Sequence, residues 1–75
     1  MPTLHEARIR RMMTIRGLAK LAGIAPTTIQ LAEAGQRQPR FGTMKKIAAA
    51  LGVEPTEIAE FHAVIEDAVE GKEAA

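Results

Sequence analysis

Residues 18–35, Leu-Ala-Lys-Leu-Ala-Gly-Ile-Ala-Pro-Thr-Thr-Ile-Gln-Leu-Ala-Glu-Ala-Gly, predict two short helices joined by a tight turn. Gly23 marks the end of the first helix and Pro26 the start of the second, because glycine tolerates positive φ after a helix and proline suits a first helical turn. Gly35 marks the end of the second helix. A short helix with polar side chains on its outer face fits the DNA major groove, which is about 12 Å wide.

The length and composition predict one small domain spanning residues 1–75. The chain has no cysteine, which excludes disulfides and thiolate metal sites. It has no apolar run near the roughly 20 residues of a membrane span, and its first residues lack the pattern of a signal peptide. We therefore expect a soluble cytoplasmic protein that does not contact membranes.

Charge divides the chain into two parts. Residues 1–53 carry nine basic and two acidic side chains, a balance of +7, whereas residues 54–75 carry one basic and seven acidic side chains, a balance of −6. Either part is also compatible with an ordinary solvated face. A basic part that contains two helices joined by a tight turn favours a polyanionic partner, with the acidic end pointing away from it.

The spacing of apolar residues predicts an all-α fold of five helices and no strands. We expect these helices at about 4–13, 15–22, 26–34, 41 (or 43)–51 and 55–70, the last one ending at Gly71. The helical spacing assigns the following side chains of the first and fourth helices to the core: Ile9, Met12, Met13, Met44, Ile47, Ala48 and Leu51.

The segment from about Arg8 to Ile58 resembles the Xre/Cro-type helix-turn-helix family, which includes the phage lambdoid repressors. The matching positions are specific as a set, whereas any two of them are not. They are Leu18, Ala19, Gly23, Ile24, Ile29, Glu33, Gly35, Pro39 and residues 47–53. The resemblance implies a compact five-helix, lambda-repressor-like domain, with a core at about 4–58, that regulates transcription as a homodimer on double-stranded DNA. A repressor is the expected form.

The resemblance also makes 26–34 the recognition helix and divides the DNA contacts into two groups. The side chains expected to read bases are Pro26, Thr27, Thr28, Gln30 and Leu31. Gln30 is able to form the bidentate contact to adenine if it faces the groove, and no arginine is present for guanine. The side chains expected to contact phosphates, rather than to form a merely solvated loop, are Arg16, Lys20, Gln36, Arg37, Gln38 and Arg40.

Three positions have particular structural consequences in this comparison. Glu33 matches a family glutamate that pairs with an arginine of the first helix, here Arg8, in a structural ion pair. Ile15 stands where the family often has a glutamine that contacts phosphate, which puts that contact in doubt. Ala25 stands where the family usually has a capping serine or threonine, so Pro26 alone sets the start of the recognition helix.

The C-terminal helix at about 55–70 is longer than the family's usual one. Its apolar residues form a seam of about two heptads, which favours a dimer interface, although the helix can instead fold back on its own core. The seam consists of Ile58, Phe61, Ile65, Ala68 and Val69.

Other function classes have less support. The modest set of base-reading side chains and the long apolar last helix leave open an antitoxin-like or adaptor protein that binds a protein partner. His62 and Glu66 are spaced for one face of a helix, but two ligands do not complete a metal site. No constellation of catalytic residues is present, so we expect neither an enzyme nor a cofactor.

Overall fold

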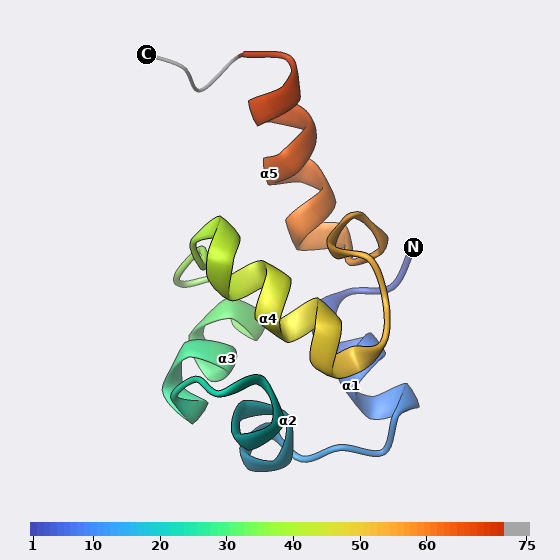
Figure 1. The fold of residues 1–75 in the computed structure, drawn as a ribbon, viewed down its shortest axis with the longest axis vertical. Coiled ribbons are helices and arrows are strands. Elements are labelled where there is room, and N and C mark those ends of the chain that lie inside the picture. The colour runs from blue at the N-terminus through green and yellow to red at the C-terminus, as the bar shows by residue number, and fades with distance from the viewer. Residues whose placement is uncertain (72–75) are drawn as a thin grey trace.

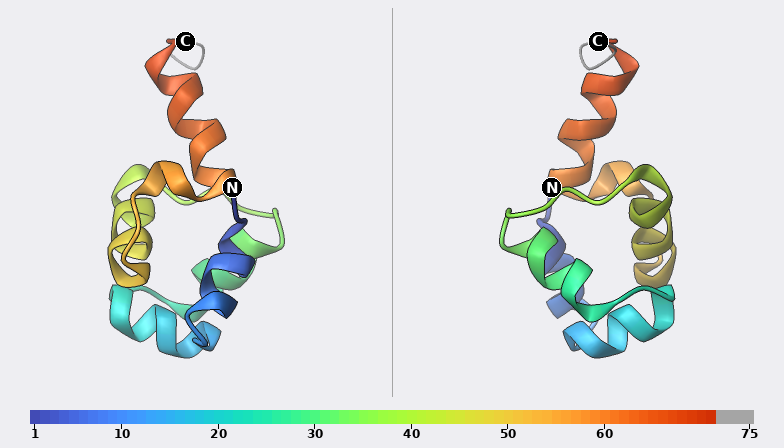
Figure 2. Two further views of the ribbon diagram at one scale, coloured as in Figure 1. Left: turned by 90° about the vertical axis from the view of Figure 1, so that its right-hand side faces the viewer. Right: turned by 90° about the vertical axis from the view of Figure 1, so that its left-hand side faces the viewer.

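The computed structural model describes residues 1–71 of the chain. They form five α-helices and one 3-10 turn, with no strand in this part: α1 (Leu4–Arg10), α2 (Ile15–Ala22), α3 (Pro26–Glu33), α4 (Phe41–Leu51), η1 (Pro55–Glu57) and α5 (Ala59–Val69). The predicted all-α fold of five helices is therefore confirmed. In Figures 1 and 2, α1 to α4 form a rounded body, and α5 projects from it.

The core lies between α1, α2, α3 and α4 and is closed by the start of α5. α2 packs against both α3 and α4, and η1 packs against α4 and α5. Eight large side chains are less than 2% exposed: Leu4, Leu18, Ile29, Met44, Ile47, Leu51, Ile58 and Phe61. Burying a side chain of this size contributes about 1.5–3 kcal/mol, so these eight residues account for most of what holds the helices together.

The first helix is shorter than predicted and buries a different face. α1 ends at Arg10, and Met12 adopts a positive φ of 56°. Met12 is 93% exposed and Ile9 is half exposed, so the prediction that both fill the core is wrong. Met13 does pack against the core. Apolar spacing alone misses this ending, because the chain reverses where the Met12 and Met13 N–H groups bond back to the last turn of α1.

The C-terminal helix is interrupted near its start. Pro55 opens only the short turn η1, and Ile58 is extended at φ −104° and ψ 125°, so the expected continuous helix from Pro55 is wrong. The chain is held here by the N-terminus, where Ala59 N–H donates to Pro2 O at 2.8 Å. Leu4 N–H donates to Glu60 Oε1 at 2.9 Å. These two bonds fix the direction in which α5 leaves the body.

Gly17 lies in the first turn of α2, where a helix ordinarily disfavours glycine by about 1 kcal/mol relative to alanine. Thr14 caps this helix, and the Gly17 N–H donates to Thr14 Oγ1 at 2.9 Å. A Cβ on residue 17 would lie 3.1 Å from the same oxygen, closer than ordinary van der Waals contact. A side chain at residue 17 would therefore require a small shift of Thr14, although the equivalent cap of α1, in which Glu6 N–H donates to Thr3 Oγ1, accommodates one.

We predict that Met12→Gly stabilises the protein by about 1 kcal/mol, because positive φ strains any residue with a Cβ and the Met12 side chain, being exposed, packs against little. Chemical denaturation followed by circular dichroism measures this change. Arg10→Gly, inside α1, is the matched control and should destabilise by about 1 kcal/mol. A Met12→Gly variant that is less stable than the original protein would show that the strain is not relieved.

Candidate nucleic-acid interface

The turn between α2 and α3 is built mainly by the backbone. Gly23 adopts φ 74°, and the next N–H, that of Ile24, donates to Ala19 O at 3.0 Å. Ala25 is extended and gives α3 no side-chain cap, so Pro26 occupies the first helical position without one. Proline suits this position because its fixed φ is already helical and a helix leaves its first N–H groups unbonded.

A buried ion pair fastens α3 to α1. Arg8 Nε donates to Glu33 Oε2 at 2.6 Å and Arg8 Nη2 donates to Glu33 Oε1 at 3.0 Å. Arg8 Nη1 also donates to Met13 O at 2.9 Å, which ties the turn before α2 to the same guanidinium. His5 lies at the edge of the pair, with its Nδ1 3.2 Å from Glu33 Oε1. The expected pair is thus extended by a histidine.

The pair changes the pKa of both partners. Burial by itself raises the pKa of Glu33, but hydrogen bonds and charge from Arg8 and His5 outweigh it, so the pKa falls below its ordinary value of 4.5. The hydrogen bond to Glu33 raises the pKa of Arg8 despite the opposing effect of burial. Both side chains therefore stay charged near neutral pH, as a structural ion pair requires.

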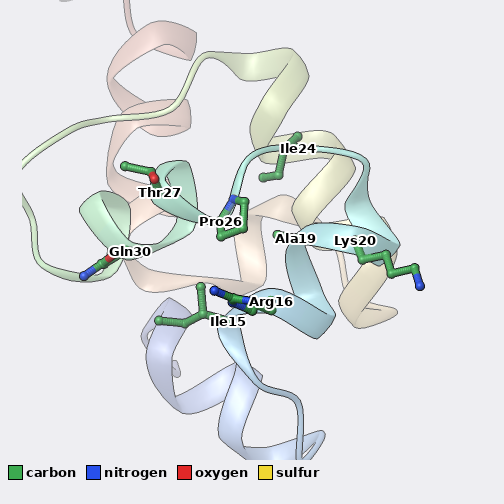
Figure 3. A pocket seen from close by; sticks show the side chains of 8 residues that line it. All are labelled: Ile15, Arg16, Ala19, Lys20, Ile24, Pro26, Thr27 and Gln30. Carbon is green, nitrogen blue, oxygen red and sulfur yellow. The ribbon is translucent and has the colours of Figure 1, made fainter.

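The residues expected to read bases do not share one environment. Pro26, Thr27 and Gln30 are exposed on α3, whereas Thr28 and Leu31 are half-buried. Figure 3 shows Thr27 and Gln30 on the same open side of α3, with Arg16 and Lys20 projecting from α2. These side chains belong to an open cleft, called the α2–α3 cleft below, that is lined by Ile15, Arg16, Ala19, Lys20, Ile24, Pro26, Thr27 and Gln30.

A second group of polar side chains lies at the other side of α3. A shallow depression there brings Thr28 together with the loop that follows α3, and it is lined by Thr28, Arg37, Gln38, Pro39, Arg40 and Thr43. The loop is fixed at its start because Leu31 O accepts hydrogen bonds from Gln36 N–H at 2.9 Å and Arg37 N–H at 3.3 Å. Thr28 therefore faces this loop, while Thr27 faces the cleft.

All six residues expected to contact phosphates are exposed. Arg16 and Lys20 line the cleft, and Arg37, Gln38 and Arg40 line the depression, but Gln36 lines neither. Within residues 1–71, none of the four cations of this set forms an ion pair. Their charges are available to an outside anion, and they stand in two groups with the exposed face of α3 between them.

The structure divides the expected dimer seam. Ile58 and Phe61 are fully buried in the protein's own core, so the expectation that they form an interface with another chain is wrong. Ile65 and Ala68 are half-buried, and Val69 is 74% exposed. The alternative to a dimer seam, in which the helix folds back on its own core, describes the beginning of α5. There Ala59 and Glu60 form hydrogen bonds with Pro2 and Leu4, which hold the helix against the body.

Two kinds of feature are absent from residues 1–71, namely a metal-ligating cluster and a membrane-spanning helix. No group of three or more metal-ligating side chains lies together in this part of the chain, and His62 and Glu66 gain no third ligand. Nor does any helix in this range have the length and apolar character needed to cross a membrane.

Two residues near the interface were not expected from the sequence. Ile15 is half-buried: it packs partly against the core and also lines the α2–α3 cleft. Its place where the resemblance led us to expect a glutamine was the available signal. His5 is the second residue, and its spacing of three residues from Arg8 places both on one face of α1.

Comparison with known proteins gives one match. A helix-turn-helix family model of Cro/C1 type matches residues 4–58, which includes α1 to α4 and η1. No curated protein and no solved structure matches the chain. The family match ends just before α5, so α5 is the part of this chain that the family model does not describe.

We predict that Glu33→Gln destabilises the protein by about 3 kcal/mol at neutral pH, because it leaves the Arg8 charge buried without a counter-ion. Since folding lowers the pKa of Glu33, its carboxylate stabilises the protein above the ordinary value of 4.5. This contribution is lost as pH falls through the lower pKa of the folded state, so the difference between the variant and the original protein should shrink there.

Urea unfolding at about pH 7, 5 and 3 measures both effects. The exposed Asp67→Asn change is the matched control, since it also turns an acid into an amide, and it should alter stability by no more than about 0.5 kcal/mol. A penalty for Glu33→Gln that stays constant down to pH 3 would contradict the assigned role of the ion pair.

Proposed function

Since the chain belongs to the Cro/C1-type helix-turn-helix family, we propose that it is a sequence-specific DNA-binding repressor of transcription. It places α3 in the major groove of double-stranded DNA and acts as a homodimer on two half-sites. A protein that occupies a promoter element blocks access to it, which is why repression is the mode we propose.

The observation that carries this proposal is the pair of cation groups on either side of α3. A major groove is bordered by two phosphate strands, so a helix inserted in it needs positive charge on both sides. Arg16 and Lys20 supply this charge from α2, and Arg37 and Arg40 supply it from the loop after α3. Because none of these four is neutralised by a neighbour in residues 1–71, each retains its charge for a phosphate.

Base reading in this proposal rests mainly on Thr27 and Gln30, the exposed polar side chains of α3. Gln30 offers two hydrogen bonds to adenine, and Thr27 offers a hydroxyl and a methyl group. Thr28 and Leu31, which are half-buried, contribute at the edges of the contact. Such a surface discriminates modestly at each base, so specificity comes from pairing two half-sites about 34 Å apart.

In this proposal the dimer contact lies at the exposed end of α5. Ile65, Ala68 and Val69 are the members of the original seam that keep exposed surface, although Ile65 also packs partly against the core. Stable interfaces bury about 1,200–2,000 Å² in total. A contact centred on three side chains lies at the weak end of that scale. We therefore expect a dimer that forms at high concentration or on DNA.

In-vitro selection from random duplexes, followed by fluorescence anisotropy with the full chain, tests the function. The expected result is a recurring symmetric sequence that binds more tightly than random DNA at moderate salt. A chain that prefers no duplex would overturn the proposal. It would favour the antitoxin-like or adaptor alternative, in which the protein binds another protein.

We predict that Arg37→Glu combined with Arg40→Glu weakens binding to selected and random duplexes alike, because phosphate contacts carry no sequence information. Each phosphate contact removed should also reduce the slope of log K against log salt by about 0.9, so the double variant should lose about four times that amount as a dimer on two half-sites. Thr27→Ala should instead change the preference among duplexes and leave the salt slope intact. Anisotropy titrations at several salt concentrations measure both quantities.

Arg10→Glu is the charge control, because Arg10 shares a surface with Pro2 and Glu57 rather than with α3. It should weaken binding far less than the loop variants. Equal effects of the loop, Thr27 and Arg10 variants would show that the loop does not contact phosphates, and Thr27 does not read bases, in the way proposed.

We predict that Val69→Asp weakens dimer formation, because it places two carboxylates across the two-fold contact. Sedimentation should show a mass that rises with concentration above 8.1 kDa for the original protein but not for the variant. The variant should also lose more affinity for a duplex with two half-sites than for one with a single half-site. Ala63→Asp, on the opposite face of α5, is the control and should leave both measurements unchanged. One chain bound per two-site duplex would contradict the dimer.

A further inference from the structure

The α2–α3 cleft contains an apolar surface inside the basic DNA-facing side of the molecule. Ile15 begins α2 and Pro26 begins α3, and both line the cleft together with Ala19 and Ile24. Figure 3 shows Ile15 and Pro26 close to the centre of the cleft, with Thr27 and Gln30 to one side and Lys20 to the other. Hydrocarbon side chains thus lie among the polar side chains of this cleft.

The side chains of this apolar surface offer no hydrogen bond to a base. Ile15, Ala19 and Ile24 carry only hydrocarbon, and Pro26 lacks a backbone N–H. The Ile24 N–H is already bonded to Ala19 O at 3.0 Å. A polar group placed against this surface would give up its water without gaining a partner, which costs about 1–3 kcal/mol. These four side chains therefore favour an apolar group over a polar one at the place where they meet, while Arg16, Thr27 and Gln30 of the same cleft can donate hydrogen bonds beside them.

Among the base groups in the major groove, the C5 methyl of thymine is the one large apolar group; the others are hydrogen-bond donors and acceptors or small C–H edges such as C5–H of cytosine. The cations that line the cleft, Arg16 and Lys20, suit the phosphates that accompany any base in this position. Charge and apolar character together thus match a thymine edge with its adjoining backbone.

We propose that the apolar part of the α2–α3 cleft is a specificity site for the C5 methyl of a pyrimidine, with Ile15 and Pro26 as its walls. This inference rests on the proposed function, since it assumes that α3 lies in the major groove. Thymine is the natural occupant. A methylated cytosine carries the same group at the same place, so the site also distinguishes 5-methylcytosine from cytosine.

The test uses the full chain and its selected duplex, in which each thymine in turn is replaced by deoxyuridine. This change removes the C5 methyl and keeps every hydrogen-bonding group. One thymine in each half-site should respond, with binding weakened about fourfold per methyl removed. At the same position, 5-methylcytosine should bind about fourfold more tightly than cytosine.

Variants of Ile15 assign the response to the cleft. Ile15→Thr puts a hydroxyl in the apolar surface and should abolish the response at that thymine, while Ile15→Val should reduce it. Leu21→Ala is the matched control, because Leu21 is an exposed apolar residue of α2 that lies outside the cleft, and it should leave the response intact. Circular dichroism melting shows which variants stay folded, and Ile15→Val decides the question if Ile15→Thr does not fold.

Three results would overturn the inference. These are selected half-sites without thymine, a deoxyuridine scan with no sensitive position, and a sensitive position that the Ile15 variants leave unchanged. The second and third results would indicate that the cleft contacts a deoxyribose or no part of the DNA. Each is distinct from failure of the proposed function, which would appear earlier as the absence of any preferred duplex.

Discussion

The position of α3 depends on the guanidinium of Arg8. α3 has only eight residues, no capping side chain at its start and no basic residue in its last turn. An isolated helix of this length is unstable in water, so tertiary contacts must hold it. Ile29 and Ala32 bury its inner face, and Glu33 receives two hydrogen bonds from Arg8 at its end. The same guanidinium bonds to Met13 O, so one side chain sets α3 relative to both α1 and the turn before α2. Lysine has no planar fork with which to make these contacts together.

The position of α5 determines where the acidic part of the chain lies relative to the basic part. The acidic C-terminal part begins at Glu54, and α5 projects from the end of the body opposite α2 (Figure 1). Glu60 is used internally, since it accepts the N–H of Leu4 at the start of α1. The later turns of α5, which carry Glu66 and Asp67, extend away from the end of the body where α2 lies (Figure 1). In the proposed complex, the repulsion between these acids and DNA, and the proposed dimer contact, would both lie at a distance from the groove.

Much of the fold could be predicted from the glycines at which helices end. Gly23, Gly35 and Gly52 follow helices in the structure, each with φ near 73°, which is the conformation that glycine adopts readily. Met12 occupies the equivalent place after α1, but a methionine gives no local signal for positive φ, so apolar spacing predicted too long a helix. The prediction of α5 failed for another reason. Its start is fixed by Pro2 and Glu60 through bonds between residues more than 50 positions apart, and no local pattern reveals them.

The candidate site shows the same division between local and long-range information. The resemblance to a family indicated Arg8 and Glu33, and the structure contains that pair. The different surroundings of Thr27 and Thr28 were beyond prediction, because they depend on how the loop after α3 folds back onto the helix. Ile15 was visible as a departure from the family pattern, but its meaning needed the neighbouring Pro26. Only the packing of α2 against α3 turns two separate apolar residues into one wall of a cleft.

The weak dimer contact and the modest reading surface that we propose have a common consequence. One methyl group changes affinity about fourfold and a bidentate contact changes it by about 1–3 kcal/mol, so one half-site discriminates little. Two half-sites bound together double that free energy. If the chains associate weakly in solution, the duplex itself brings them together, and a second correct half-site is needed for tight binding. Limited contact at Val69 would then increase specificity, because a chain on a single chance half-site gains no help from a partner.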